Sequence, residues 1–220
     1  MTASTLINLD FSGTFSSDFD KGTGSYAAYS SGTLVISGHG LVLAKTSCGT
    51  GDKWMRFTMP TFTSDQESVG VACGDGSGTA LLAIFSRETA TLNGKLSQMA
   101  AFTAYITEGT DYSPVSTPIT WVNPTTVPYG ISFEASTGIV RFWVNPTAAT
   151  PTAVNSWDGV DATCQFVSPV TFTTFSRLGF GSWDTTPQAN AFDNFTGGNF
   201  GGGGGPSIAV LASSYLLHQT

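Results

Sequence analysis

Acids and histidines, the side chains that most often do catalysis, are few in this sequence and far apart. The chain has four glutamates, Glu67, Glu88, Glu108 and Glu134. Cleavage of a glycosidic bond needs two carboxyl groups within ~10 Å in one cleft, and no two glutamates are spaced to suggest such a pair. A serine nucleophile would need a histidine, yet neither His39 nor His218 is accompanied by a Gly-x-Ser-x-Gly turn. We therefore expect a protein that is not an enzyme.

Aspartates offer a second kind of chemistry, because calcium binds to carboxylate and carbonyl oxygens. Asp18 and Asp20 lie together near the start of the chain, and Asp193 lies near its end. If the first and last strands pair, the three carboxylates become neighbours and could hold Ca²⁺. The same residues also suit solvated loops and strand edges, where Asp commonly accepts backbone hydrogen bonds. Both interpretations are open.

Loop tryptophans offer a third kind, because an aromatic ring can stack on the apolar face of a sugar. Trp157 is followed by Asp158, and Trp183 by Asp184, in segments rich in polar residues. These four residues are the candidates for carbohydrate binding. In the other interpretation, both tryptophans fold down over the edge of the domain and are buried.

Composition narrows the class of partner. Acidic residues outnumber basic ones by 15 to 8, for a net charge of −7, and no run of Lys or Arg is present. A nucleic-acid-binding surface needs clustered cations, so nucleic acid is not expected as a partner. Charged residues make up 10% of the chain, which indicates a polar, mostly uncharged surface. The three cysteines, Cys48, Cys73 and Cys164, lack metal-ligand spacing and are expected to be buried or half-buried thiols; the alternative is one disulfide with one cysteine left over.

Short runs rich in Val, Ile, Phe, Thr and Trp alternate with Gly, Ser, Asn and Pro, and helical periodicity is nearly absent. The sequence therefore predicts an all-β fold. The clearest local prediction is a hairpin over residues 129–145, with residues 136–138 as its turn. Trp54 and Trp143 lie in alternating strands and are expected in the core or on a sheet face. The predicted strands are residues 5–11, 27–29, 33–37, 40–45, 54–59, 68–73, 80–87, 99–106, 119–122, 129–135, 139–145, 171–175, 177–181 and 191–196.

The C-terminal end is unlike the rest of the chain, because five glycines and Pro206 precede a short apolar run. We expect a folded domain at residues 1–198, a Gly-rich linker at 199–206 and a docking tail at 207–220. The apolar run is ~10 residues long, about half of a membrane span, so we expect no membrane insertion. The tail is predicted to dock on a partner protein. Its expected anchors are Val210, Leu211, Tyr215, Leu216 and Leu217.

The order of these elements resembles a concanavalin A-like or laminin-G-like jelly roll, two antiparallel sheets packed face to face, over about residues 5–197. The segments that carry the resemblance are residues 9–12 and 33–38, 68–73 and 79–86, the 129–145 hairpin, 177–181 and the closing run Phe192-Asp193-Asn194-Phe195. The resemblance implies that the closing strand pairs with the opening strand. Members that cleave glycans carry a Glu-x-Asp-x-Glu type motif, which this sequence lacks. Some relatives bind Ca²⁺ through loop carboxylates.

These features favour a structural protein of a virion, namely a bacteriophage head decoration, head-fibre or tail component. Residues 1–5 have neither the basic region nor the apolar core of a signal peptide, so assembly in a host cytoplasm is expected. Its partners would be other virion proteins and copies of itself. This assignment rests on analogy at the level of the fold. The alternative is a lectin-like carbohydrate-binding module that grips a surface glycan, and a glycan-active enzyme is a third possibility.

Overall fold

The structure is a computed structural model, and it describes residues 2–21, 26–37, 40–59, 68–75, 80–88, 91–99, 119–120, 127–168, 171–182 and 190–201. The predicted docking tail, with its anchors at residues 210, 211 and 215–217, lies outside the described residues. So do two of the four carbohydrate-binding candidates, Trp183 and Asp184.

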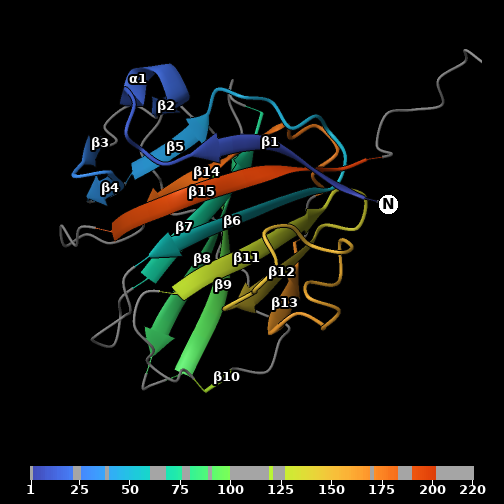
Figure 1. The fold of residues 1–220 in the computed structure, drawn as a ribbon. Helices are drawn as coiled ribbons and strands as arrows, with labels where there is room; N and C mark the ends of the chain where they lie inside the picture. The colour runs from blue at the N-terminus through green and yellow to red at the C-terminus, as the bar shows by residue number, and fades with distance from the viewer. Residues whose placement is uncertain are drawn as a thin grey trace, which may run out of the picture.

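Two antiparallel sheets pack face to face, which confirms the predicted jelly-roll sandwich (Figure 1). Sheet A contains, in spatial order, β13 (Cys164–Val167), β12 (Ile139–Val144), β11 (Val127–Glu134), β6 (Lys53–Met59), β15 (Asn190–Phe200), β4 (Thr33–Ser37) and β3 (Tyr26–Ser30), with β1 (Ala3–Leu9) also paired to β15. Sheet B contains β10 (Ile119–Thr120), β9 (Thr91–Met99), β8 (Ala80–Glu88), β7 (Ser68–Gly74), β14 (Arg177–Ser182), β5 (Gly40–Ala44) and β2 (Phe19–Lys21). The helix α1 (Phe15–Asp18) is one short turn, and no helix in the described part of the chain is long and apolar enough to cross a membrane.

β15 joins the parts of sheet A, because it pairs with three strands. Residues 190–192 pair with β4, residues 193–199 with β6, and residues 195–200 with β1. In Figure 1, β1 and β15 run side by side across the front of the molecule. The predicted pairing of the opening strand with the closing strand is therefore confirmed.

β11 and β12 form the predicted hairpin. Tyr129 pairs with Val144 and Glu134 with Ile139. The turn closes where the Gly138 N–H donates to the Glu134 carbonyl oxygen at 3.0 Å. Gly138 has a φ of +75°, a conformation that costs a glycine little and other residues more.

Some segments depart from the predicted strands. β9 covers Thr91–Met99, although it contains Asn, Gly and Lys, which are weak strand formers; its nine residues of pairing with β8 outweigh that local preference. The predicted strand at 99–106 lies outside the described residues beyond Met99. Residues 171–175 form no strand, because their apolar pattern comes from Phe172 and Phe175, which are buried on either side of a turn. The short strands β2 and β13 were not predicted.

The core between the sheets is rich in aromatic rings. Phe57 of β6 meets Phe180 of β14 edge to face, with ring centroids 5.1 Å apart. Phe180 also contacts Phe192 at 4.3 Å and Phe195 at 4.9 Å, both from β15. All four rings are fully buried. These contacts connect the two sheets, and edge-to-face aromatic pairs add to the gain from burial.

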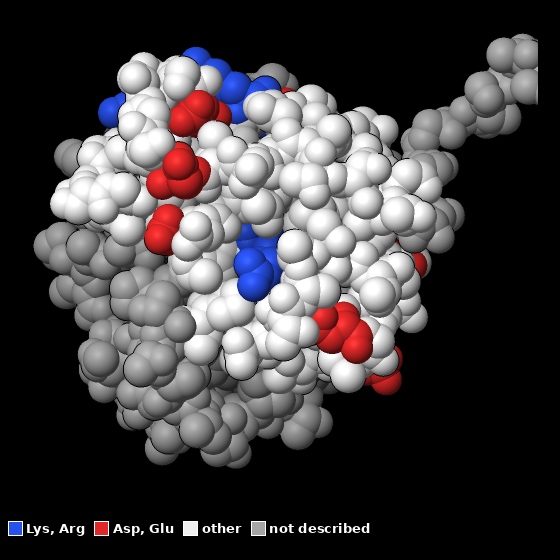
Figure 2. All heavy atoms as spheres, in the orientation of Figure 1, with Lys and Arg blue, Asp and Glu red and all other residues white. Residues whose placement is uncertain are grey.

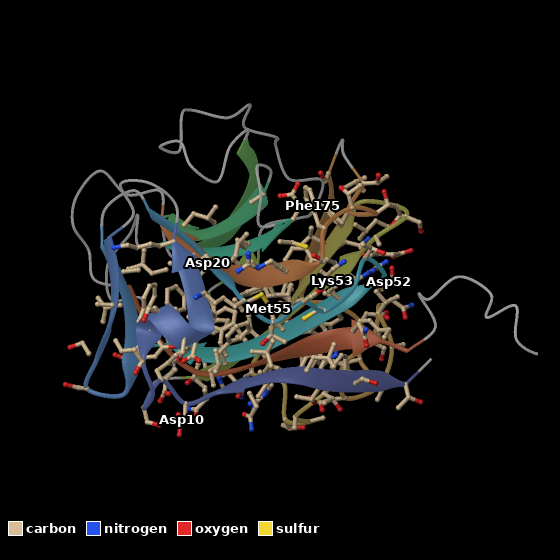
Figure 3. The ribbon with its side chains drawn as sticks, turned by 90° about the horizontal axis from the view of Figure 1, so that it is seen from above. Asp10, Asp20, Asp52, Lys53, Met55 and Phe175 are labelled. Carbon is tan, nitrogen blue, oxygen red and sulfur yellow. The ribbon has the colours of Figure 1, made fainter. Side chains whose placement is uncertain are left out.

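One charged side chain, Lys53, also points into this core. Along β6 the side chains alternate, so Lys53 lies on the same side as Met55 and Phe57. Figure 3 shows Lys53 and Met55 in the space between the sheets. Lys53 is fully buried, and its Nζ donates to the Gly51 carbonyl oxygen at 2.5 Å. Burial therefore lowers the pKa of Lys53 below that of an exposed lysine.

Two thiols share this end of the core with Lys53. Cys48 and Cys73 are both buried and unbridged, which confirms the expectation of buried thiols for these two residues. Burial raises the pKa of Cys48 to about 11 and that of Cys73 to about 12, although the positive charge of Lys53 opposes both shifts. Both cysteines are accordingly thiols at neutral pH.

Replacement of Lys53 by Met tests the cost of the buried amine. K53M keeps the length of the side chain and removes the charge, so the free energy of unfolding at pH 6 should be unchanged or higher by up to ~3 kcal/mol. The pKa of Lys53 is lower in the folded chain than in the unfolded chain, where it is 10.5. The free energy of unfolding of the wild type therefore increases with pH until the pH reaches that unfolded pKa. Urea denaturation should show the difference between K53M and wild type narrowing as pH rises. A difference that widens would contradict this account.

Candidate functional site

The outer face of sheet A, turned away from sheet B, has a covered half and an open half. Residues 145–163 follow β12 and fold back over β6, β11 and β12; we call them the cap loop. Figure 1 shows this segment in front of β11 and β12. Beneath it is a second, smaller core, separate from the one between the sheets. Its buried members are Trp54, Trp143, Trp157 and Phe200.

Trp157 is the centre of this second core. Its side chain is 0% exposed and stands edge-on to Trp54 at 5.9 Å and tilted against Trp143 at 5.6 Å. Its Nε1 donates to the Ala148 carbonyl oxygen at 3.0 Å. The prediction that Trp157 offers an exposed ring to a sugar is therefore wrong. Trp157 instead fits the other interpretation, a loop tryptophan folded down over the sandwich. This arrangement is favourable because burying the indole removes a large apolar area from water.

A glycine in β11 makes room for this ring. A Cβ built on Gly130 would lie 2.7 Å from two carbon atoms of the Trp157 indole. Any other residue at position 130 would push the ring away from the sheet. Gly130 and Trp157 are thus a matched pair that seats the cap loop on sheet A.

Asp158, the neighbour of Trp157, holds the two ends of the cap loop together. Its carboxylate accepts hydrogen bonds from the backbone N–H groups of Thr147 at 2.6 Å and Ala148 at 2.7 Å. Partial desolvation opposes ionisation, but these backbone donors prevail and hold the pKa of Asp158 below its usual value. Asp158, predicted as a carbohydrate contact, is exposed, yet both of its oxygens already serve the loop.

Ser132 and Arg141, which lie beneath the cap loop, are also paired. The Ser132 hydroxyl donates to the Val154 carbonyl oxygen at 2.6 Å, and the Arg141 guanidinium donates to the same oxygen at 3.4 Å. Arg141 also forms an ion pair with Glu134 at 2.7 Å. The covered half of the face is therefore closed, although the buried Nε1 of Trp54 has no hydrogen-bond partner there.

The open half carries a patch of polar side chains, which we call the outer-face strip. It consists of Asn8, Arg56, Thr58, Asp193, Asn194 and Thr196. Asn8 of β1, Thr196 of β15 and Arg56 of β6 are partners in register, so they form one row across three strands. Asp193 and Thr58 form the next row. All six are exposed or half-buried.

Hydrogen bonds order part of the strip. The Asn194 Nδ2 donates to the Thr58 hydroxyl at 3.3 Å, and that hydroxyl donates to the Asp193 carbonyl oxygen at 3.2 Å. Arg56 borders the cap loop, where its Nη2 donates to the Pro146 carbonyl oxygen at 3.3 Å. Figure 2 shows this face: positive atoms lie near its centre over β6 and β11, among uncharged atoms, with acidic atoms toward its edges.

The carboxylates predicted to bind calcium are already engaged. Asp20 lies 2.7 Å from Arg177 and 3.6 Å from Lys45, and the hydrogen bond from Arg177 holds the pKa of Asp20 below its usual value. Asp18 accepts a hydrogen bond from the Tyr29 hydroxyl at 2.7 Å. Burial, aided by this bond, raises the pKa of Tyr29.

Asp193 is engaged as well. One of its carboxylate oxygens accepts the N–H of the next residue, Asn194, at 2.7 Å. No group of three or more His, Cys, Asp or Glu side chains in the described part of the chain could hold a metal ion. Cations or hydroxyl and amide donors therefore already engage carboxylate oxygens of Asp18, Asp20 and Asp193.

Comparisons with known proteins are informative only at the level of structure. No family model and no curated protein matches this sequence. The pseudo β-1,3-glucanase Rv0315 of Mycobacterium tuberculosis has a TM-score of 0.50 at 13% identity, with 89% of this chain and 99% of that chain covered. A legume lectin-like domain from Entamoeba histolytica has a TM-score of 0.47 at 7% identity, with 84% of this chain and 91% of that chain covered. The lumenal domain of VIP36, bound to Ca²⁺ and Man3GlcNAc, has a TM-score of 0.47 at 9% identity, with 91% of each chain covered.

These similarities concern the fold. The chain has a concanavalin A-like jelly-roll β-sandwich fold, as the order of its strands predicted. Nothing in the comparisons indicates a bacteriophage origin, so the predicted virion role has no support from them.

The sequence contained a signal for Arg56 that the prediction did not use. In Trp54-Met-Arg-Phe-Thr-Met, Arg56 and Thr58 alternate with residues of the core, which places both on the outer face. The position of Asn8 beside Thr196 depends on strand register, which the sequence alone does not give.

Substitution of Gly130 tests the seating of Trp157. G130A should lower the free energy of unfolding by about 1–3 kcal/mol, because the added methyl group overlaps the indole. The control is G13A, where the nearest atom to the new Cβ would be a side-chain oxygen at an ordinary 3.5 Å. Urea denaturation measures both variants. Equal stability of G130A and wild type would show that the ring does not sit on the sheet as described.

Substitution of Asp158 tests the closure of the cap loop. D158A removes both acceptors and also places Ala at a φ of +55°, so local opening should become easier by about 1–2 kcal/mol. Hydrogen exchange at the Thr147 and Ala148 amides should be faster in D158A by roughly tenfold or more. D158N keeps one acceptor and tolerates the positive φ, so its effect should be smaller. Unchanged exchange in D158A would contradict the proposed role.

Proposed function

We propose that this domain is a lectin-like module that binds a glycan without cleaving it, and that the outer-face strip is its binding surface. One observation carries the proposal: an open row of amide, hydroxyl and guanidinium groups crosses three adjacent strands beside a closed loop. Glycans present many hydroxyl groups, and amide, hydroxyl and charged side chains are the usual partners of such groups.

The strip is suited to recognition because its side chains come from paired strands. Strand pairing fixes the spacing between Asn8, Thr196 and Arg56, so little ordering is required when a ligand binds. The cap loop borders the strip at Arg56 and gives it one fixed edge. A surface of this kind binds by contact along a chain rather than by enclosure in a deep pocket.

The fold favours the same assignment by analogy. Rv0315, which matches at a TM-score of 0.50, is described as a pseudo β-1,3-glucanase. That description applies to Rv0315 and not to this chain. Analogy of fold is a weak argument for function, so the proposal depends on the strip. A bacteriophage virion role, residence in a virion and docking through residues 207–220 remain predictions, because the tail lies outside the described residues.

Binding to immobilised polysaccharides tests this proposal. The panel contains β-glucans, mannans, xylans and uronic-acid-containing glycans, and the product of each incubation is checked for chain cleavage. We expect retention of the wild type on at least one glycan without release of shorter chains. No retention on any of them, or cleavage of the retained one, would contradict the proposal.

Variants of β1 locate the surface. N8A removes an exposed amide of the outer-face strip. The control, S4A, removes an exposed hydroxyl of the same strand, but Ser4 pairs with Asn199 and is not part of the strip. Loss of one or two hydrogen bonds should weaken binding by N8A about 3- to 10-fold. S4A should bind as the wild type does. Equal binding by both variants would place the glycan elsewhere.

A further inference from the structure

Arg56 is the cation of the strip, and its guanidinium is incompletely paired. It makes one side-chain hydrogen bond among the described residues, from Nη2 to the Pro146 carbonyl oxygen at 3.3 Å. Its Nε is buried from water and has no hydrogen-bond partner. A guanidinium carries five N–H donors, so most of its donors have no partner among the residues that the structure describes.

In the described part of the chain, no acid compensates its charge at close range. Other basic side chains do have an acid beside them: Arg141 pairs with Glu134, and Arg177 and Lys45 pair with Asp20. Asp158 acts on Arg56 electrostatically but forms no ion pair with it, and its oxygens are held by Thr147 and Ala148. Arg56 is therefore half-buried, and none of the acids that the structure describes lies within contact distance of it as a counter-charge.

This arrangement is unfavourable unless an anion completes it. Partial burial removes water from the guanidinium and lowers the pKa of Arg56, although the group stays charged at neutral pH. A carboxylate can accept two parallel N–H donors from a guanidinium, and this bidentate pair is among the strongest polar contacts in proteins. An external carboxylate would supply the missing partner.

The surroundings of Arg56 restrict the kind of anion. Its neighbours in the row are neutral, Asn8 and Thr196, whereas Asp193 lies in the next row and Asp158 in the cap loop. Together with the net charge of −7, these carboxylates disfavour a dense polyanion. A mostly neutral chain with a single carboxylate at Arg56 fits the charges on this face.

We propose that Arg56 is the specificity residue of the outer-face strip and binds the carboxylate of a uronic acid residue in an otherwise neutral glycan. The inference rests on the proposed function and narrows its ligand class. Asn8 and Thr196 contact the hydroxyl groups of the same or the adjacent sugar. The carboxylate lies at the end of the row that the cap loop borders.

Nuclear magnetic resonance of the ¹⁵N-labelled full chain tests this directly. The probes are methyl β-glucuronoside, methyl β-glucoside, which has a hydroxymethyl group in place of the carboxylate, and sodium acetate. The Arg56 Nε–H signal is identified as the one missing in R56K. The glucuronoside should shift this signal and the amides of residues 8 and 196, the glucoside should leave the Nε–H signal in place, and acetate should bind at least tenfold more weakly than the glucuronoside.

Variants separate this inference from a general effect of charge. R56Q should lose the response to glucuronoside, and R56K, which keeps the charge but not the planar fork, should bind about tenfold more weakly than wild type. K21Q removes one positive charge from the exposed Lys21 of β2 in sheet B and should respond as the wild type does. Thermal unfolding confirms that each variant is folded, and R56K provides the test if R56Q is not.

The outcomes distinguish this inference from the proposed function. If the glucoside shifts the strip amides as strongly as the glucuronoside, or if R56Q and R56K respond as the wild type does, the strip binds glycan but Arg56 does not select a uronate. If acetate binds as well as the glucuronoside, Arg56 is a general carboxylate site and the inference is wrong. If none of the probes shifts Arg56, the inference is also wrong, while the polysaccharide panel decides on glycan binding separately.

Discussion

An indole ring occupies the space above β11 where a side chain at position 130 would otherwise lie. Because Gly130 has no Cβ, Trp157 can pack against the strand and against Trp54 and Trp143 at once. The position of this ring fixes the cap loop, and Asp158 then ties the ends of the loop through two backbone amides. The loop covers one half of the outer face and leaves the other half open. The extent of the outer-face strip follows from this single contact.

Electrostatics explain why one residue of the strip differs from the others. The chain has few charges, and Arg141 and Arg177 each lie 2.7 Å from a carboxylate. Arg56 contacts no carboxylate of residues 2–21, 26–37, 40–59, 127–168, 171–182 or the other described segments, although it is partly removed from water. Lys53 is buried too, but it lies in the core between the sheets, where no ligand reaches it. Burying its charge therefore affects the stability of the fold. Arg56 faces outward, so a ligand can complete its pairing.

The sequence predicted the architecture better than the site. Alternating strands, the 129–145 hairpin and the Phe192–Phe195 closing run were sufficient to assign a two-sheet jelly roll, since each depends on local pattern and turn chemistry. β9 was missed because its pairing with β8 outweighs weak strand formers. The prediction placed Trp157 on the surface because the sequence of a polar loop with a tryptophan beside an aspartate is the same whether the ring is exposed or buried. The difference depended on Gly130, 27 residues away, whose contact with the ring only the fold reveals.

The most direct test of the account is to map, residue by residue, where a glycan contacts this domain. Titration of the ¹⁵N-labelled chain with an oligosaccharide retained in the polysaccharide panel, followed through its backbone amides, gives that map. The account predicts the largest shifts at Asn8, Arg56 and Thr196, with smaller shifts at the edge of the cap loop. Shifts confined to sheet B, with those three amides unmoved, would contradict the claim that the open half of sheet A is the binding surface.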